Sequence, residues 1–106
     1  MPESITVADL ATRMNAGVVD LVDVREVHEF VAGHVPGSRS IPMSVLPVRL
    51  DEISRGTEVL LICQSGARSM QVAIWLANQG YTPTNVTGGT GAWVLAGGPI
   101  DQGMTA

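Results

Sequence analysis

Lysine is absent from this 106-residue sequence, and cysteine occurs only once. The basic residues are six scattered arginines, and the net charge is −4. A nucleic-acid partner would need a basic patch or stripe, so none is expected. The single cysteine excludes a disulfide within the chain, a cysteine-rich metal site and a resolving-cysteine pair. Because the arginines are scattered, any anion that binds must be held by a few groups close together in the chain.

Long apolar runs are also missing. No stretch reaches the roughly 18 apolar residues that a membrane-spanning helix needs, so no membrane partner is expected. The N-terminal segment "MPESITVADL" lacks the basic and apolar regions of a secretory signal. We therefore expect a cytoplasmic protein.

The length and the hydrophobic content are typical of one compact domain. Hydrophobic residues make up 45% of the chain, which is enough for one core but too little for two at this length. We see no linker, internal repeat or low-complexity tract. A single domain over residues 1–106 is therefore expected.

Helix-like and strand-like segments alternate along the chain. Capping residues Thr6 and Asp9 and a terminating Gly17 predict the first helix. The predicted helical segments are 6–17, a short turn over 26–33, a short helix starting near Pro47, 69–80 and 91–99. The predicted extended segments are 18–24, a brief piece at 40–41, 58–63 and a short strand within 82–89.

This alternation predicts an α/β fold with a mainly parallel sheet and helices on both faces. The most hydrophobic strand, Glu58–Cys63, should lie at the centre of the sheet. In the following helix, the predicted buried face comprises Met70, Val72, Ala73, Ile74, Leu76 and Ala77. Ligands collect at the carboxyl ends of parallel strands, so Cys63 is expected where a ligand would bind.

The stretch "CQSGARS" around this cysteine has two interpretations. A lone cysteine after an apolar strand is often a small buried hydrophobe. However, a short loop of small residues leads from Cys63 into a helix, and Gly66 can take a positive φ angle. Such a loop points its N–H groups inward and forms an anion-binding nest at a helix N-terminus. A thiol held there should ionise below its free pKa of about 8.5, and Arg68 can hold an anionic substrate.

Three motifs in the correct order resemble the rhodanese-type sulfurtransferases. They are "LVDVREVHEFVAGHVPGSRSIP", "CQSGARS" and "VTGGTGAW" followed by "GGP", which together span most of the chain. The resemblance implies a single-domain, three-layer α/β/α rhodanese fold with a mainly parallel five-stranded sheet. It also implies that Cys63 carries a sulfane sulfur as a persulfide, without a metal or organic cofactor. The implied substrate-binding residues are Gln64, Ser65, Gly66, Ala67, Arg68 and Ser69.

The resemblance also implies the partners: a small anionic sulfur donor and a thiophilic acceptor, either cyanide, a thiol or a protein. Four residues separate Cys63 from Arg68, whereas related phosphatases have a loop one residue longer, so phosphatase activity is not favoured. Many family members carry a basic residue where this sequence has Gln64. That departure favours a protein or small-molecule persulfide over thiosulfate as the donor. The loop also lacks the Gly-Val-Thr ending typical of mercaptopyruvate-type enzymes.

Three charged residues lie at and just after the end of the first main strand: Asp23, Arg25 and Glu29. Arg25 is a candidate for positioning substrate. The preferred interpretation is that all three form an ion-pair network that braces the loop, because an arginine beside carboxylates usually pairs with them.

Other residues are assigned to structure. His34 is expected to be a structural hydrogen-bonding residue rather than an acid or base, and His28 to be exposed. Trp75 and Trp93 are interpreted as packing residues. Two glycines, 88 and 89, should allow a close approach to the rim of the site, and residues Met43 and Val45 are expected near its mouth.

Two functions remain open from the sequence. The first is an enzyme, a sulfurtransferase of the thiosulfate sulfurtransferase class. The second is a non-enzymatic persulfide carrier or protein-interaction module. The enzyme and the carrier both use Cys63, and multiple turnover with small substrates separates them, whereas an interaction module would show neither loading nor turnover.

Overall fold

The computed structural model describes residues 1–104, so the last two residues of the predicted domain lie outside the described part. Five parallel strands form one sheet in the order β1-β5-β4-β2-β3. The strands are β1 (Glu3–Ile5), β2 (Leu21–Asp23), β3 (Arg39–Ser40), β4 (Glu58–Ile62) and β5 (Thr82–Val86). The helices are α1 (Val7–Ala16), α2 (Val27–Ala32), α3 (Ala67–Asn78) and α4 (Gly89–Leu95), with two 3-10 turns, η1 (Leu46–Val48) and η2 (Leu50–Glu52).

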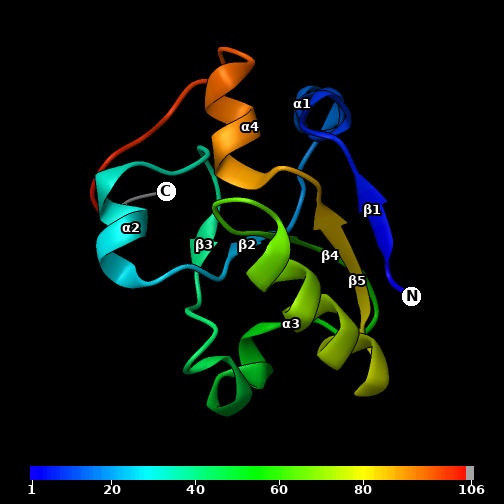
Figure 1. Cartoon of the computed structure of the whole chain (residues 1–106). Helices are drawn as coiled ribbons and strands as arrows, with labels where there is room; N and C mark the ends of the chain where they lie inside the picture. Colours follow the sequence, from blue (N-terminus) through cyan, green and yellow to red (C-terminus); the bar gives the residue numbers. More distant parts are fainter. Residues whose placement is uncertain (105–106) are drawn as a thin grey trace.

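The sheet separates two layers of helices (Figure 1). Helices α1 and α4 cover one face and contact each other, whereas α3 packs against β4 and β5 on the other face. Each face has its own hydrophobic core, one containing Leu10 and Trp93 and the other containing Val72 and Leu76. The predicted three-layer α/β/α fold with a parallel five-stranded sheet is therefore confirmed.

Strand β4 lies at the centre of this sheet, as predicted. Its side chains alternate between the faces: Val59 and Leu61 join the core under α3, and Leu60 and Ile62 join the core under α1 and α4. Cys63, directly after the strand, continues this alternation on the α3 side. The geometry of β4 thus turns the thiol toward the N-terminus of α3.

The cap predicted for the first helix is present. The Asp9 amide donates to the Thr6 hydroxyl oxygen at 3.1 Å, and the Thr6 amide donates to the Asp9 carboxylate at 3.3 Å. Gly17 ends the helix by donating its N–H to the Arg13 carbonyl oxygen. These reciprocal bonds satisfy donors that the first turn leaves free.

Several predicted boundaries are wrong. The edge strand β1 was not predicted from the N-terminal segment, because it has three residues and only Ile5 is buried. Strand β2 is shorter than predicted, since Val18 is fully exposed. The helix expected near Pro47 is two 3-10 turns.

The predicted buried face of α3 is also partly wrong. Helix α3 begins at Ala67, two residues before the predicted start at residue 69. Its buried residues are Ser69, Val72, Ala73 and Leu76, whereas Ile74 and Ala77 are exposed and Met70 is half-buried. The buried face begins at a serine because that residue contacts Cys63, which a hydrophobicity pattern does not reveal.

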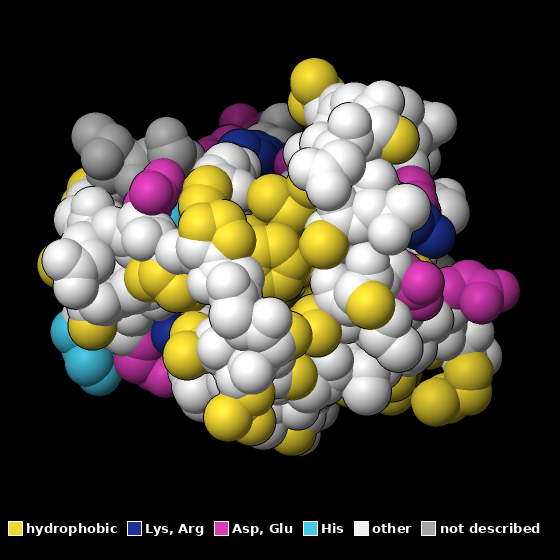
Figure 2. Space-filling model, turned by 90° about the horizontal axis from the view of Figure 1, so that it is seen from above, with side chains coloured by type: hydrophobic (Ala, Val, Ile, Leu, Met, Phe, Trp, Pro, Cys, Tyr) yellow, Lys and Arg dark blue, Asp and Glu magenta, His cyan; other side chains and the backbone are white. Residues whose placement is uncertain are grey.

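The surface carries little unpaired positive charge. Five of the arginines form ion pairs with carboxylates, and the sixth, Arg55, donates to the Gln79 carbonyl oxygen and stacks over Tyr81. On the side of α1 and α4, hydrophobic side chains gather near the middle of the face and basic side chains are few (Figure 2). No helix among the described residues is long and apolar enough to cross a membrane.

Candidate active site

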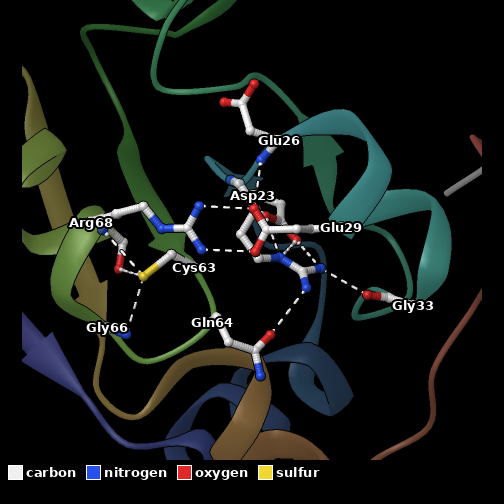
Figure 3. A network of polar contacts seen from close by, with 10 residues as sticks. Asp23, Glu26, Glu29, Gly33, Cys63, Gln64, Gly66 and Arg68 are labelled. Carbon is white, nitrogen blue, oxygen red and sulfur yellow. Dashed lines mark hydrogen bonds and ion pairs between the residues drawn. The ribbon is translucent and has the colours of Figure 1, made fainter.

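The residues from Cys63 to Ser69 form a tight loop between the carboxyl end of β4 and the first turn of α3 (Figure 3). Two carbonyl groups of the loop accept hydrogen bonds from amides in the first turn of α4. The Thr90 amide donates to the Cys63 carbonyl oxygen at 2.8 Å, and the Gly91 amide donates to the Gln64 carbonyl oxygen at 3.0 Å. Helix α4 thus holds these two carbonyls on its own side of the loop.

The Cys63 Sγ atom receives hydrogen bonds from its own loop. The Gly66 amide donates at 3.1 Å, the Ser69 amide at 3.4 Å and the Ser69 hydroxyl oxygen lies at 3.3 Å. The residue is almost fully buried, at 1% exposure. An anion at this sulfur would therefore be stabilised by fixed donors in a site with little water.

These contacts change the acidity of the thiol. Burial by itself raises the pKa of Cys63, but the hydrogen bonds from the Ser69 hydroxyl and from the amides of Ser69, Gly66 and Ser65 outweigh it. The net result is a pKa below the ordinary value for cysteine. The thiolate, which is the nucleophilic form, is favoured.

Gly66 makes the turn possible. Its φ angle is +100°, in the region that residues with a Cβ atom rarely adopt, and a Cβ there would lie 3.2 Å from the Gly88 nitrogen. Ser65 and Ala67, predicted with it as loop residues, flank the turn and are exposed. The sequence therefore located the turn correctly.

Arg68 forms an ion pair that the sequence did not indicate. Its two terminal nitrogens each donate to one oxygen of the Glu29 carboxylate, both at 2.8 Å. The hydrogen bonds from Arg68 lower the pKa of Glu29 to about 2. The bidentate pair therefore stays intact as the pH falls below the ordinary pKa of a glutamate, and is lost only near pH 2.

Arg25 connects β2 to the loop. Its Nη2 atom donates to Asp23 at 2.8 Å and to the Gly33 carbonyl oxygen at 2.7 Å, and its Nη1 atom donates to the Gln64 side-chain oxygen at 3.2 Å. Asp23 and Arg25 are both buried. Asp23 thus pairs with Arg25, whereas Glu29 pairs with Arg68. The three residues form parts of two separate ion pairs and not the single network that was expected.

Asn85 is a buried neighbour of the site that sequence reasoning missed. It lies on β5, beside β4, and its Oδ1 accepts a hydrogen bond of 2.6 Å from the Ser69 hydroxyl. Its Nδ2 donates to the Gly66 carbonyl oxygen at 3.3 Å. A polar residue inside the buried run of a strand is the signal that could have drawn attention to it.

The other residues singled out in the sequence differ in how deeply they are buried. His34 is fully buried, stacks on Phe30 and places Nδ1 2.9 Å from the Phe30 carbonyl oxygen. His28 is exposed. Trp93 is buried and donates to the Pro99 carbonyl oxygen. Gly89 passes so near the loop that a Cβ there would lie 2.2 Å from the Cys63 carbonyl oxygen.

A groove of about 250 Å³ lies beside α3. Met43 and Trp75 line it together with Leu46, Pro47, Gln71 and Val72, whereas Val45 is a half-exposed surface residue. Among the described residues, no group of three or more His, Cys, Asp and Glu side chains could hold a metal ion.

The fold and the site together define a class of protein: a parallel α/β domain with a thiolate-stabilising loop between its central strand and the next helix. The rhodanese-like domain model matches residues 6–96. A sulfurtransferase of Allochromatium vinosum is 41% identical over 81 residues, which are 76% of this chain and 76% of that protein. A rhodanese-related protein of Thermoplasma volcanium superposes with a TM-score of 0.86 at 31% identity, covering 93% of this chain and 97% of that one.

The chain belongs to the rhodanese-like domain family. The resemblance found in the three sequence motifs is therefore confirmed. An HTH-type transcriptional regulator of Mycobacterium tuberculosis is also similar, with 37% identity over 103 residues. These residues are 95% of this chain but 46% of the regulator, so this chain corresponds to about half of that relative.

Proposed function

We propose that this protein is a sulfurtransferase that carries a sulfane sulfur as a persulfide on Cys63. The observation that supports this most is the convergence of the Gly66 amide, the Ser69 amide and the Ser69 hydroxyl on one sulfur atom. Membership of the rhodanese-like family and the similarity to a sulfurtransferase point in the same direction. The proposed unit is one domain over residues 1–106, acting in the cytoplasm.

The proposed reaction has two displacements. The Cys63 thiolate attacks the outer sulfur of the donor, a sulfur–sulfur bond forms, and the donor's remainder leaves with the electron pair of the broken bond. The acceptor, cyanide or a thiolate, then attacks the outer sulfur of the persulfide and releases the Cys63 thiolate. N–H groups of the loop from Gln64 to Ser69 stabilise negative charge in both anionic states. Neither step needs a metal or an organic cofactor.

The donor we favour is a persulfide on a thiol or a protein rather than thiosulfate. Both terminal nitrogens of Arg68 donate to Glu29, and Gln64 accepts from Arg25. Arg68 would have to give up that pair to bind a dianion with its paired donors. The carboxylate of Glu29 also repels a second anion.

A relay module is the second candidate, and one observation favours it. Cys63 is 1% exposed, so a free small molecule has little access to its sulfur. A partner protein that fits the site could deliver sulfur once and collect it once. In that case the protein is loaded by a donor but does not turn over small substrates.

Steady-state assays with cyanide as the acceptor compare the donors directly. We expect kcat/KM to be higher with glutathione persulfide than with thiosulfate, because thiosulfate is a compact dianion whose reactive sulfur is bonded directly to a sulfonate group. Stoichiometric loading without turnover would favour the relay function. Loading by neither donor would contradict both.

The Glu29→Gln variant tests the explanation for donor choice. It removes the charge that repels thiosulfate and frees one donor of Arg68, so kcat/KM with thiosulfate should rise about tenfold, equivalent to about 1.4 kcal/mol. Glu26→Gln is the matched control, because it removes the same charge from the N-terminal end of the same helix, from a side chain that points away from Arg68 in Figure 3. Equal effects of the two variants, or no effect of Glu29→Gln, would contradict the assigned role of the pair.

A further inference from the structure

Asn85 forms hydrogen bonds with Gly66 and Ser69, two residues that also donate hydrogen bonds to the cysteine sulfur. It is 3% exposed on β5, where it lies opposite Leu61 of β4. Its Oδ1 accepts from the Ser69 hydroxyl at 2.6 Å, and its Nδ2 donates to the carbonyl oxygen of Gly66 at 3.3 Å. One side chain therefore links the two loop residues that contact Cys63 Sγ.

The Ser69 hydroxyl has two acceptors and one proton. Its oxygen lies 2.6 Å from Asn85 Oδ1 and 3.3 Å from Cys63 Sγ. An amide oxygen can only accept, and a hydroxyl carries a single proton, so both contacts cannot be full hydrogen bonds from Ser69 at once. Each distance suits a hydrogen bond to its acceptor, because bonds to sulfur are longer than bonds to oxygen, so Asn85 Oδ1 and Cys63 Sγ compete for the one proton.

The two charge states of the cysteine use this proton differently. A neutral thiol can donate its own proton to the Ser69 oxygen, while the Ser69 proton stays with Asn85 Oδ1. A thiolate can only accept, so it competes with Asn85 Oδ1 for the Ser69 proton. If the thiolate takes the proton, Asn85 loses the donor to its buried oxygen, which opposes ionisation.

We propose that Asn85 is a positioning residue of this site: by competing for the proton of the Ser69 hydroxyl, it limits the hydrogen bonding that the Cys63 thiolate receives. The thiolate is consequently less stabilised and more nucleophilic. After sulfur loading the negative charge moves to the outer sulfur, and Sγ becomes a neutral, weak acceptor. Asn85 therefore disfavours the thiolate more than the persulfide, which promotes loading.

This inference rests on the proposed role of Cys63 as the reactive thiol, but alkylation tests it without a sulfur donor. If the protein failed to transfer sulfur, the alkylation profile would still report on the ionisation of Cys63. The charged groups around Cys63 are Asp23 at the end of β2, Arg25 just after it, Glu29 of α2 and Arg68 of α3. None of them changes in the experiment, so a shift reports on the hydrogen bond.

The experiment measures the rate of alkylation by iodoacetamide against pH in wild type and in Asn85→Leu. The chain has one cysteine, so the rate reports on Cys63 alone. Leucine has a similar size but accepts no hydrogen bond, so the Ser69 proton becomes available to the thiolate. We expect the midpoint of the profile to fall by about half a unit to one unit. At high pH, where all of the protein is thiolate, the rate should fall about two- to threefold because nucleophilicity falls with pKa.

A double-mutant cycle separates this role from a merely structural one. In the Ser69→Ala background there is no hydroxyl proton to compete for, so Asn85→Leu should leave the midpoint unchanged. Thr84→Val, at the neighbouring buried position of β5, is the matched control and should not shift the midpoint. Thermal unfolding verifies that each variant is folded, and Asn85→Ala replaces Asn85→Leu if the latter does not fold.

Two results would overturn the proposal. One is an unchanged or higher midpoint in a folded Asn85 variant. The other is an equal shift with and without the Ser69 hydroxyl.

Discussion

Replacing Cys63 with serine is expected to abolish sulfur loading and to lower turnover at least about a thousandfold. A serine hydroxyl has nearly the same shape but does not ionise near neutral pH, so it gives no anionic nucleophile. The effect should be complete because this is the chain's only cysteine, and no other thiol can substitute. Intact-mass measurement after incubation with glutathione persulfide checks loading.

The serine variant should remain folded, because the side chain contributes a small part of a larger hydrophobic core. Thermal unfolding provides that control. Wild-type protein should gain the mass of one sulfur atom and lose it again when cyanide is added. An equal mass gain in Cys63→Ser would show that sulfur is bound elsewhere.

Gly89→Ala should damage both the fold and the site. The added Cβ atom would lie 2.2 Å from the Cys63 carbonyl oxygen and 2.8 Å from the Gln64 carbonyl oxygen. Both are backbone atoms, so neither can move aside as a flexible side chain could. The contact forces α4 away from the loop and breaks the bond from the Thr90 amide to the Cys63 carbonyl oxygen. We expect a loss of about 3 kcal/mol in the free energy of unfolding, together with loss of sulfur loading.

Gly97→Ala is the matched control for backbone strain. Gly97 also has a positive φ angle, +82°, but a Cβ there meets nothing within 4 Å. Its cost should be about 1 kcal/mol, and loading should be retained. Denaturant unfolding gives both free energies. A similar, small cost for the two variants would show that the approach of α4 to the loop is not tight.

Local sequence patterns predicted the parts of the molecule that local chemistry determines. The run of apolar residues before Cys63 predicted the central strand, and Gly66 marked the tight turn. The capping residues Thr6 and Asp9 predicted the start of α1 correctly. In each case the residues that form the feature are neighbours in the chain.

The features that were missed involve residues far apart in the sequence. Arg68 pairs with Glu29, 39 residues away, and Ser69 bonds to Asn85, 16 residues away. Periodicity cannot predict such pairs, because each depends on how the strands are ordered in the sheet. The buried face of α3 was predicted partly wrongly for a related reason. The polar residue Ser69 is buried by its contact with Cys63, which lies outside the helix.

The central claim is that the loop stabilises negative charge on the Cys63 sulfur, and the pH dependence of alkylation tests it most directly. The rate should be measured in the folded protein and in the same protein unfolded in denaturant, where the thiol should titrate near its free pKa of about 8.5. Because the hydrogen bonds lower the pKa of Cys63, the folded protein should show the lower midpoint. A midpoint in the folded protein that equals or exceeds that of the unfolded chain would contradict the account.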